Sequence, residues 1–170
     1  MKNINIFCFG FGQVAKSFIK KLKNEGYKLK ISSTSRKKTS KNKFDKIIYN
    51  SFFLNKNNFD PKIINEIKKS DYILISIPPS NNTDVVFKNF SNIIEKSKAQ
   101  WITYLSSTSV YGDHAGKWVN ENSDTKPTSV KGKNRLNAEK LWISLYLRKK
   151  IPLQIFRLSG IYSNEKNVLL

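Results

Sequence analysis

Short runs of β-branched and aromatic residues alternate along this chain with longer stretches in which apolar residues recur at helical spacing. Such alternation is typical of a doubly wound sheet of parallel strands covered by helices. The pattern therefore predicts one α/β domain over residues 1–170, with about six strands and with helices on both faces. The predicted strands are residues 3–9, 28–34, 46–49, 72–77, 101–105 and 153–158. The predicted helices are residues 13–25, 61–69, 84–96 and 129–149.

Two segments show neither a strand period nor a helix period. Residues 35–43 are polar and basic, and residues 112–128 have no regular spacing of apolar positions. We expect both to be loops. Residues 106–109, which are all Ser or Thr, predict a turn at the end of the fifth strand.

The sequence contains no apolar run that approaches the ~20 residues of a membrane-spanning helix. The apolar run at residues 4–9 is too short for the core of a signal peptide and leads directly into a glycine turn. We therefore expect a cytoplasmic protein without a membrane partner. Cys8 is the only cysteine, which excludes a disulfide framework and a cysteine-rich metal site, and its apolar neighbours predict a buried thiol.

The chain is strongly basic, with 31 Lys and Arg residues against 12 Asp and Glu residues and a formal net charge of +19. Such an excess favours binding to phosphates, so electrostatic binding to nucleic acid or to an acidic membrane is one alternative. The excess consists mostly of lysine and is spread over nearly every predicted helix and loop, whereas nucleic-acid binders tend to concentrate charge on one face. We therefore expect no specific nucleic-acid partner.

A glycine-rich turn gives the strongest local signal. The sequence Gly10-Phe11-Gly12-Gln13-Val14-Ala15 follows the first predicted strand and opens the first predicted helix. In this GxGxxA pattern, Gly10 allows the tight turn, Gly12 allows the backbone to approach a pyrophosphate, and Ala15 lets the helix pack on the strand. The helix N-terminus adds free N–H groups and a positive dipole end. The strand–turn–helix context favours a dinucleotide site of the Rossmann fold over a plain tight turn.

The end of the second predicted strand bears on the choice of cofactor. An acidic residue at this place would bind the ribose 2′-hydroxyl of NAD, but the strand continues into Thr34-Ser35-Arg36. The Arg36 guanidinium could pair with the 2′-phosphate of NADP, helped by Lys37. The position of Arg36 and the absence of an acidic residue at the end of this strand both favour NADP, and NAD stays an alternative. The alternative is that residues 36–43 are only a solvated basic loop.

Three further motifs carry a resemblance to a known family. They are Tyr104-Leu105-Ser106-Ser107-Thr108-Ser109-Val110-Tyr111-Gly112-Asp113 after the fifth strand, Pro78-Pro79 after the fourth, and Arg157-Leu158-Ser159-Gly160-Ile161-Tyr162 after the sixth. Together with the glycine turn, the chain resembles the extended short-chain dehydrogenases, the NAD-dependent epimerase/dehydratase family, over nearly its whole length. The resemblance implies a Rossmann fold and adds Pro78 and Pro79 to the residues at the cofactor.

The resemblance also implies a role for Ser107. It matches the family's catalytic Ser/Thr, whose hydroxyl would bind a substrate carbonyl or hydroxyl. The alternative is a turn serine that bonds to local backbone groups.

The predicted helix at 129–149 departs from the family. The family carries a Tyr-x-x-x-Lys pair there, and the matching residues are Lys131 and Arg135, so the usual proton donor is missing. Lys131 could act only if its pKa were lowered, and a solvated lysine is the alternative. Tyr111, His114 and Tyr162 are possible substitutes, and we count Ser107, Tyr111 and Lys131 as the catalytic candidates.

The chain also ends where the family's substrate-binding portion would begin. We therefore expect apolar surface near the sixth strand to be open to a partner, such as a second copy of the chain. Val168-Leu169-Leu170 give the chain an apolar ending. Two functions remain open: an NADP-linked oxidoreductase or epimerase acting on a small carbonyl, alcohol or nucleotide-sugar substrate, or a non-catalytic NADP-binding module or redox sensor.

Overall fold

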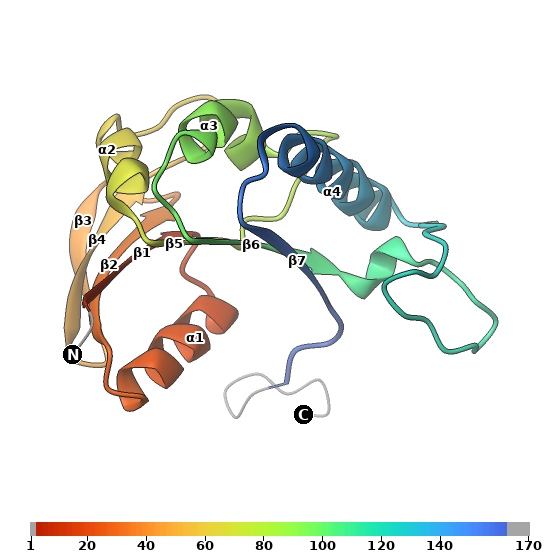
Figure 1. Ribbon diagram of the computed structural model, residues 1–170, viewed down its shortest axis with the longest axis horizontal. Helices are drawn as coiled ribbons and strands as arrows, with labels where there is room; N and C mark the ends of the chain where they lie inside the picture. The colour runs from red at the N-terminus through yellow and green to blue at the C-terminus, as the bar shows by residue number, and fades with distance from the viewer. Residues whose placement is uncertain (1–2, 163–170) are drawn as a thin grey trace.

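A seven-stranded sheet forms the centre of the protein, and six of its strands are parallel. A computed structural model describes residues 3–162 (Figure 1). The strands are β1 (Asn3–Phe9), β2 (Lys28–Ser35), β3 (Ser40–Phe44), β4 (Ile47–Phe53), β5 (Tyr72–Ile75), β6 (Trp101–Ser107) and β7 (Leu153–Leu158). The helices are α1 (Gln13–Asn24), α2 (Lys62–Lys69), α3 (Val85–Glu95) and α4 (Val130–Lys149), with one 3₁₀ turn, η1 (Thr108–Val110).

The order of strands across the sheet is β3-β4-β2-β1-β5-β6-β7. The chain starts with β1 in the middle, builds outward to β4 on one side, and then returns to add β5, β6 and β7 on the other side. The direction of building therefore reverses between β1 and β5. In doubly wound sheets, such a reversal opens a crevice at the carboxyl ends of the strands, where ligands bind.

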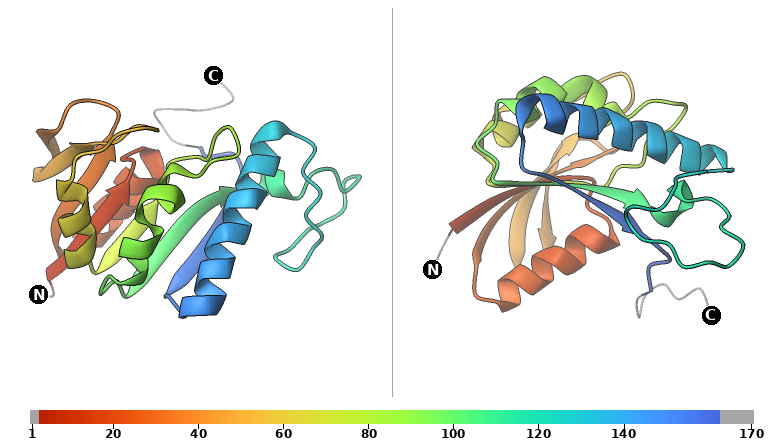
Figure 2. Two further views of the ribbon diagram at one scale, coloured as in Figure 1. Left: turned by 90° about the horizontal axis from the view of Figure 1, so that it is seen from above. Right: turned by 45° about the vertical axis from the view of Figure 1, so that its right-hand side comes forward.

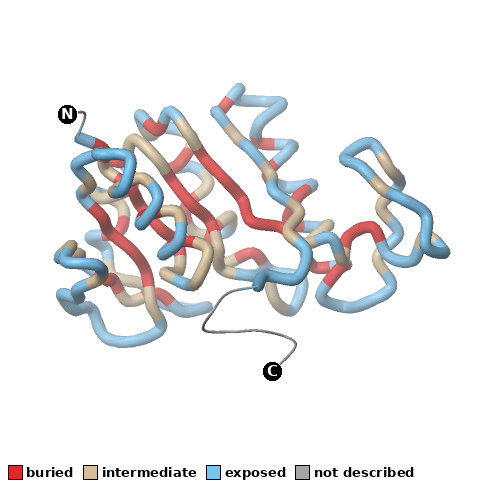
Figure 3. Tube along the Cα trace, turned by 90° about the horizontal axis from the view of Figure 1, so that it is seen from below, coloured by how far each residue is buried: buried red, intermediate tan, exposed pale blue. Residues whose placement is uncertain are grey.

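Helices cover the two faces of the sheet unequally. Helix α1 lies on one face, and α2, α3 and α4 lie on the other (Figures 1 and 2). Two apolar cores correspond to these faces: one contains Ile19 of α1, and the other contains Phe90 of α3 and Trp142 of α4. Buried residues concentrate in the central strands between the two layers (Figure 3).

The predicted α/β fold with a doubly wound sheet is confirmed, but the prediction of a loop at residues 35–43 is wrong. Residues 35–43 were expected to be a loop, whereas Ser40–Phe44 form β3, which pairs antiparallel with β4 at the sheet edge. The first four residues of β3 are exposed and only Phe44 is partly buried, so the strand has no apolar alternation for a pattern to detect. The sheet consequently has seven strands instead of about six.

Most other boundaries agree within a few residues, and β1 and β7 coincide with their predictions. Strand β5 ends at Ile75 and not at residue 77, two residues earlier than expected before the two prolines. Cys8 is fully buried as predicted, and burial raises the pKa of its thiol to about 12. Residues 168–170 lie outside the described residues.

Residues 3–162 contain neither a candidate membrane-spanning helix nor a candidate metal site. None of the described helices combines the length and apolar character needed to cross a membrane. Within the same range, no three His, Cys, Asp or Glu side chains lie close enough together to hold a metal ion.

Candidate functional site

The turns that follow β1, β2, β5 and β6 lie at the same edge of the sheet, because these four strands are parallel. This edge therefore gathers the glycine turn, Ser35–Arg36, the two prolines and Ser107. The β1–β5 reversal point lies in its middle.

Gly10 occupies a position that no other residue could fill without strain. Its φ is +84°, in the left-handed region. A Cβ atom there would lie 2.8 Å from Ser76 Oγ and 3.3 Å from Ile77 Cγ1. The Gly10 backbone N–H donates to Thr34 Oγ1 at 2.9 Å, and Ser76 Oγ donates to the Phe9 carbonyl at 2.8 Å. Thr34 of β2 and Ser76 after β5 thus hold the turn tightly.

Gly12 has the opposite surroundings. It is exposed, and a Cβ atom built on it would meet no atom within 4 Å. Gly12 is the N-cap of α1 and makes no side-chain cap bond, so the first N–H groups of the helix face open space. Ala15, one turn further on, is fully buried. These features fit a pyrophosphate at the helix N-terminus, and they lie where a Rossmann dinucleotide would bind.

The end of β2 carries a free positive charge. Arg36 is exposed and makes no ion pair with any residue between 3 and 162. Ser35 is partly buried, and its Oγ accepts a hydrogen bond from the Lys37 backbone N–H at 3.2 Å. Of the two prolines after β5, Pro78 is exposed and Pro79 partly buried.

Two serine hydroxyls lie at the end of β6. Ser107 is partly buried, and its Oγ accepts from the Ser109 N–H at 3.2 Å, the local bond expected of a turn serine. Ser106 was not singled out from the sequence. Its Oγ is buried and has no hydrogen-bond partner among the described residues. Because Ser106 and Ser107 are consecutive in β6, their side chains point to opposite faces of the sheet, and Ser106 lies on the same face as Tyr104.

Lys131 and Arg135, which the sequence resemblance matches to a Tyr-x-x-x-Lys pair, have different surroundings on α4. Lys131 is exposed, whereas the Arg135 guanidinium donates to the Leu105 carbonyl of β6. The start of the helix packs closely against the turn after β6, since a Cβ on Gly132 would lie 2.5 Å from the Ser109 carbonyl oxygen. Arg135 therefore contacts β6 near its carboxyl end. The Lys131 side chain makes no described hydrogen bond or ion pair there.

The three possible substitutes for the missing tyrosine have different surroundings. Tyr111 is buried, and the Arg157 guanidinium lies 4.8 Å from its ring centre. His114 is on the 112–128 loop, with Nε2 3.1 Å from the Asp124 carbonyl oxygen. Tyr162 is largely exposed. The structure brings Tyr111 and His114 near each other, at 6.4 Å between ring centres, but shows no hydrogen bond between them.

The Arg157 guanidinium, which lies over the Tyr111 ring, is held in place by a buried carboxylate. Glu139 of α4 is fully buried, and its Oε2 lies 2.8 Å from Arg157 Nη2. The hydrogen bonds with Glu139 raise the pKa of Arg157 above its ordinary value. This ion pair connects α4 to β7, and Tyr111 packs on it, so the described contacts of Tyr111 are structural.

No protein-family model matches the sequence, and no curated protein matches it. Solved structures do match. A UDP-glucuronic acid 4-epimerase from Bacillus cereus, in complex with NAD, has a TM-score of 0.76 at 18% identity, with 98% of this chain and 60% of the epimerase aligned. A UDP-N-acetylglucosamine 4-epimerase from Methanobrevibacter ruminantium has a TM-score of 0.74 at 16% identity, covering 92% of this chain and 55% of the enzyme.

The chain shares the Rossmann fold of these epimerases. A conserved protein of unknown function from Silicibacter pomeroyi also matches, with a TM-score of 0.73 at 27% identity, over 94% of this chain and 53% of that protein. The present chain thus spans little more than half the length of these three structures.

Proposed function

We propose that this chain is the dinucleotide-binding part of an NADP-linked epimerase or oxidoreductase related to the extended short-chain dehydrogenases. The observation that carries the proposal is the contrast between two glycines in one turn. Gly10 is enclosed by Ser76 and Ile77, while Gly12 faces open space at an uncapped helix N-terminus. An ordinary tight turn needs the first feature but not the second.

The residues at the site edge have distinct roles in this proposal. Gly12, Gln13 and Val14 hold the pyrophosphate through their backbone, and Ser35 and Arg36 hold the 2′-phosphate of the adenosine. Ser107 orients a substrate carbonyl or hydroxyl. The bound nicotinamide would supply or accept a hydride. The shared fold with UDP-sugar epimerases supports a nucleotide sugar or a related small molecule as substrate.

The first experiment is a fluorescence titration of the purified chain with NADPH and, separately, with NADH. We expect NADPH to bind more tightly. Arg36→Ala removes a charge-assisted hydrogen bond worth about 1.5–3 kcal/mol, so its Kd for NADPH rises roughly tenfold or more, while that for NADH is unchanged. Arg148→Ala, which removes an exposed arginine from α4, is the matched control and leaves both affinities unchanged. A folded chain that binds neither cofactor would refute the proposal.

A second candidate function is a non-catalytic NADP-binding module. The surroundings of Lys131 and Arg135 favour this second function, because Lys131 is exposed and Arg135 donates to a backbone carbonyl. This function predicts NADPH binding without hydride transfer to any sugar, aldehyde or ketone. If turnover occurs and is lost in Ser107→Ala while the NADPH affinity is kept, the non-catalytic function is excluded.

A further inference from the structure

A groove opens on the face of the sheet that carries α2, away from the glycine turn. The connection between the parallel strands β2 and β4 is made by the antiparallel strand β3 and not by a helix. Helix α2 is therefore the helix nearest to this edge of the sheet (Figure 1). Between α2 and the β3–β4 pair lies a cavity of about 420 Å³.

Three lysines from two elements line this groove. Lys62 and Lys69 are seven residues apart on α2, so they lie on one face of the helix, about 10 Å apart along its axis. Lys41 lies on β3 opposite Asn50 of β4. None of the three lysines forms an ion pair with another residue of the described range.

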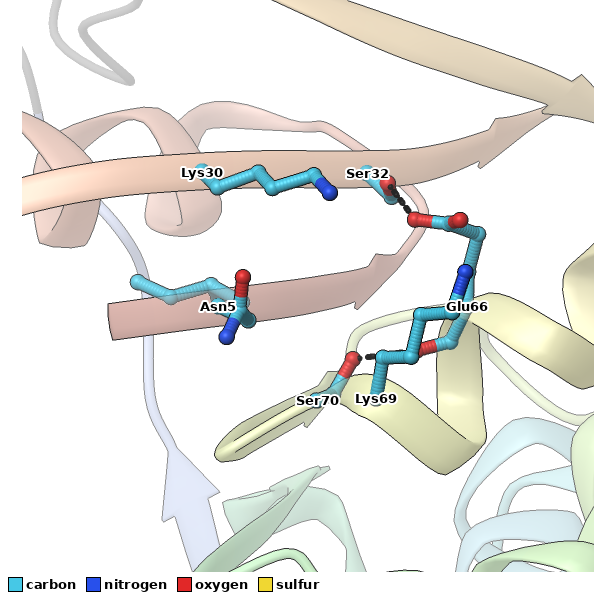
Figure 4. A pocket seen from close by; sticks show the side chains of 7 residues that line it. Asn5, Lys30, Ser32, Glu66, Lys69 and Ser70 are labelled. Atoms are coloured by element: carbon cyan, nitrogen blue, oxygen red, sulfur yellow. Dashed lines mark hydrogen bonds between the residues drawn. The ribbon is translucent and has the colours of Figure 1, made fainter. Parts of the chain in front are cut away.

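The groove contains one carboxylate, and that carboxylate is already engaged. Glu66 lies between Lys62 and Lys69 on the same face of α2, and its Oε2 accepts from Ser32 Oγ at 2.7 Å. Figure 4 shows a smaller neighbouring pocket that shares Glu66 and Lys69 with the groove and is also lined by Lys30 and Ser32 of β2.

The remaining polar lining consists of neutral groups. Asn50 and Asn65 present side-chain amides, which can donate two hydrogen bonds each. Phe52 forms an apolar part of the lining. Three ammonium groups outnumber the one lining carboxylate, and two amides add further donors, so the groove matches a ligand that carries several anionic oxygens.

We propose that the groove between α2 and the β3–β4 pair binds a small phosphate-bearing polyanion through Lys41, Lys62 and Lys69. The other lysines are spread over many helices, strands and loops. Here the ammonium groups of two elements face one cavity. The site shares no lining residue with the glycine turn or with Ser35–Arg36, so it does not depend on the proposed cofactor function.

The test is calorimetric titration of the whole chain with inorganic tripolyphosphate, using the double variant Lys62→Gln/Lys69→Gln. We expect the Kd of the variant to rise at least tenfold. The matched control is Lys133→Gln/Lys140→Gln, which removes two exposed lysines at the same seven-residue spacing on α4. The control should bind as the wild type does, and the affinity of the groove variant for NADPH should be unchanged.

Three outcomes would overturn the proposal. The wild type could fail to bind tripolyphosphate at 150 mM salt. The α2 and α4 double variants could weaken binding equally, which would show diffuse charge attraction. Arg36→Ala could abolish binding while the α2 variant retained it, which would assign the anion to the dinucleotide site. Thermal unfolding of each variant checks folding, and the single exposed substitution Lys41→Gln on β3 gives a second, milder test with an expected weakening of a few fold.

Discussion

The turn between β1 and α1 and the segment from the end of β6 into α4 lie at the same edge of the sheet, yet they differ in what they retain. In the first region, Gly10, Gly12 and Ala15 each have the surroundings that a dinucleotide turn requires. In the second region, Lys131 is exposed and Arg135 donates to the Leu105 carbonyl, and these two residues are the ones that the sequence resemblance matches to a Tyr-x-x-x-Lys pair. In the proposed site the pyrophosphate depends on the backbone geometry of the first region and the reaction on side chains of the second, so the two regions can be tested separately.

The largest effect is expected from a substitution on β7 that removes the ion-pair partner of Glu139 in α4. Arg157→Leu leaves Glu139 ionised and unpaired in a site where its side chain is 1% exposed. Removing one partner of a buried ion pair costs about 3–5 kcal/mol, and we expect the free energy of unfolding in urea to fall by this amount. Arg148→Leu, at an exposed position of α4, is the control and should change stability by less than about 0.5 kcal/mol.

Arg157→Leu also tests whether NADPH binding is independent of the Arg157–Glu139 ion pair. NADPH affinity of the folded fraction of Arg157→Leu should match that of the wild type, because the glycine turn lies on the other side of β5. A variant that kept full stability would show that Glu139 is protonated or solvated in the folded chain. A variant that lost NADPH binding while remaining folded would show that the regions are coupled.

A smaller effect is expected in the first region. Gly10 and Gly26 have nearly equal φ values, +84° and +85°, but a Cβ on Gly26 would meet no atom within 4 Å. Left-handed backbone costs a residue with a Cβ about 1–2 kcal/mol, so Gly26→Ala should lose about 1 kcal/mol of stability and no NADPH affinity. Gly10→Ala adds the contact with Ser76 Oγ and should lose about 2 kcal/mol and bind NADPH at least tenfold more weakly. Equal NADPH binding by the two variants would contradict the assignment of the turn.

The sequence allowed most of the fold to be predicted because buried strands and amphipathic helices leave a period in the pattern. Strand β3 left no such period. Its pairing with β4 is made by backbone groups, and its first four side chains are exposed. The edge of a sheet is therefore the part of a fold where hydrophobic patterning carries least information.

The candidate site was predictable to a similar degree. The glycine turn is a local feature, and its spacing predicts the tight backbone at Gly10 and the exposed helix start at Gly12 that the structure shows. The bond from Arg135 to the Leu105 carbonyl joins residues that are 30 positions apart, and the unpartnered hydroxyl of Ser106 depends on how α4 packs against β6. Neither feature leaves a signal in a single sequence, beyond the run of hydroxyl residues at 106–109.

The smallest expected effect is a difference in pH dependence between two aspartates that flank β5, Asp71 directly before the strand and Asp84 after it at the start of α3. Burial raises the pKa of Asp71, but hydrogen bonds from Asn5 (backbone N–H, 2.8 Å) and Lys98 (3.1 Å) outweigh it, and the net pKa is below 3.8. Burial dominates at Asp84, which caps α3 and accepts from Trp142 Nε1 at 2.9 Å, and its pKa is above 3.8. The two carboxyls therefore affect stability with opposite signs.

Because the folded pKa of Asp71 is lowered, its contribution is complete above pH 3.8 and is lost as the pH falls below that value. The gap in unfolding free energy between the wild type and Asp71→Asn should shrink in acid. Because the folded pKa of Asp84 is raised, its ionisation costs stability as the pH rises from 3.8 through the folded pKa. The wild type should therefore gain stability relative to Asp84→Asn as the pH is lowered from 7 toward 4. Urea unfolding of both variants at several pH values measures the two trends, and trends of the same sign would show that burial does not dominate at Asp84.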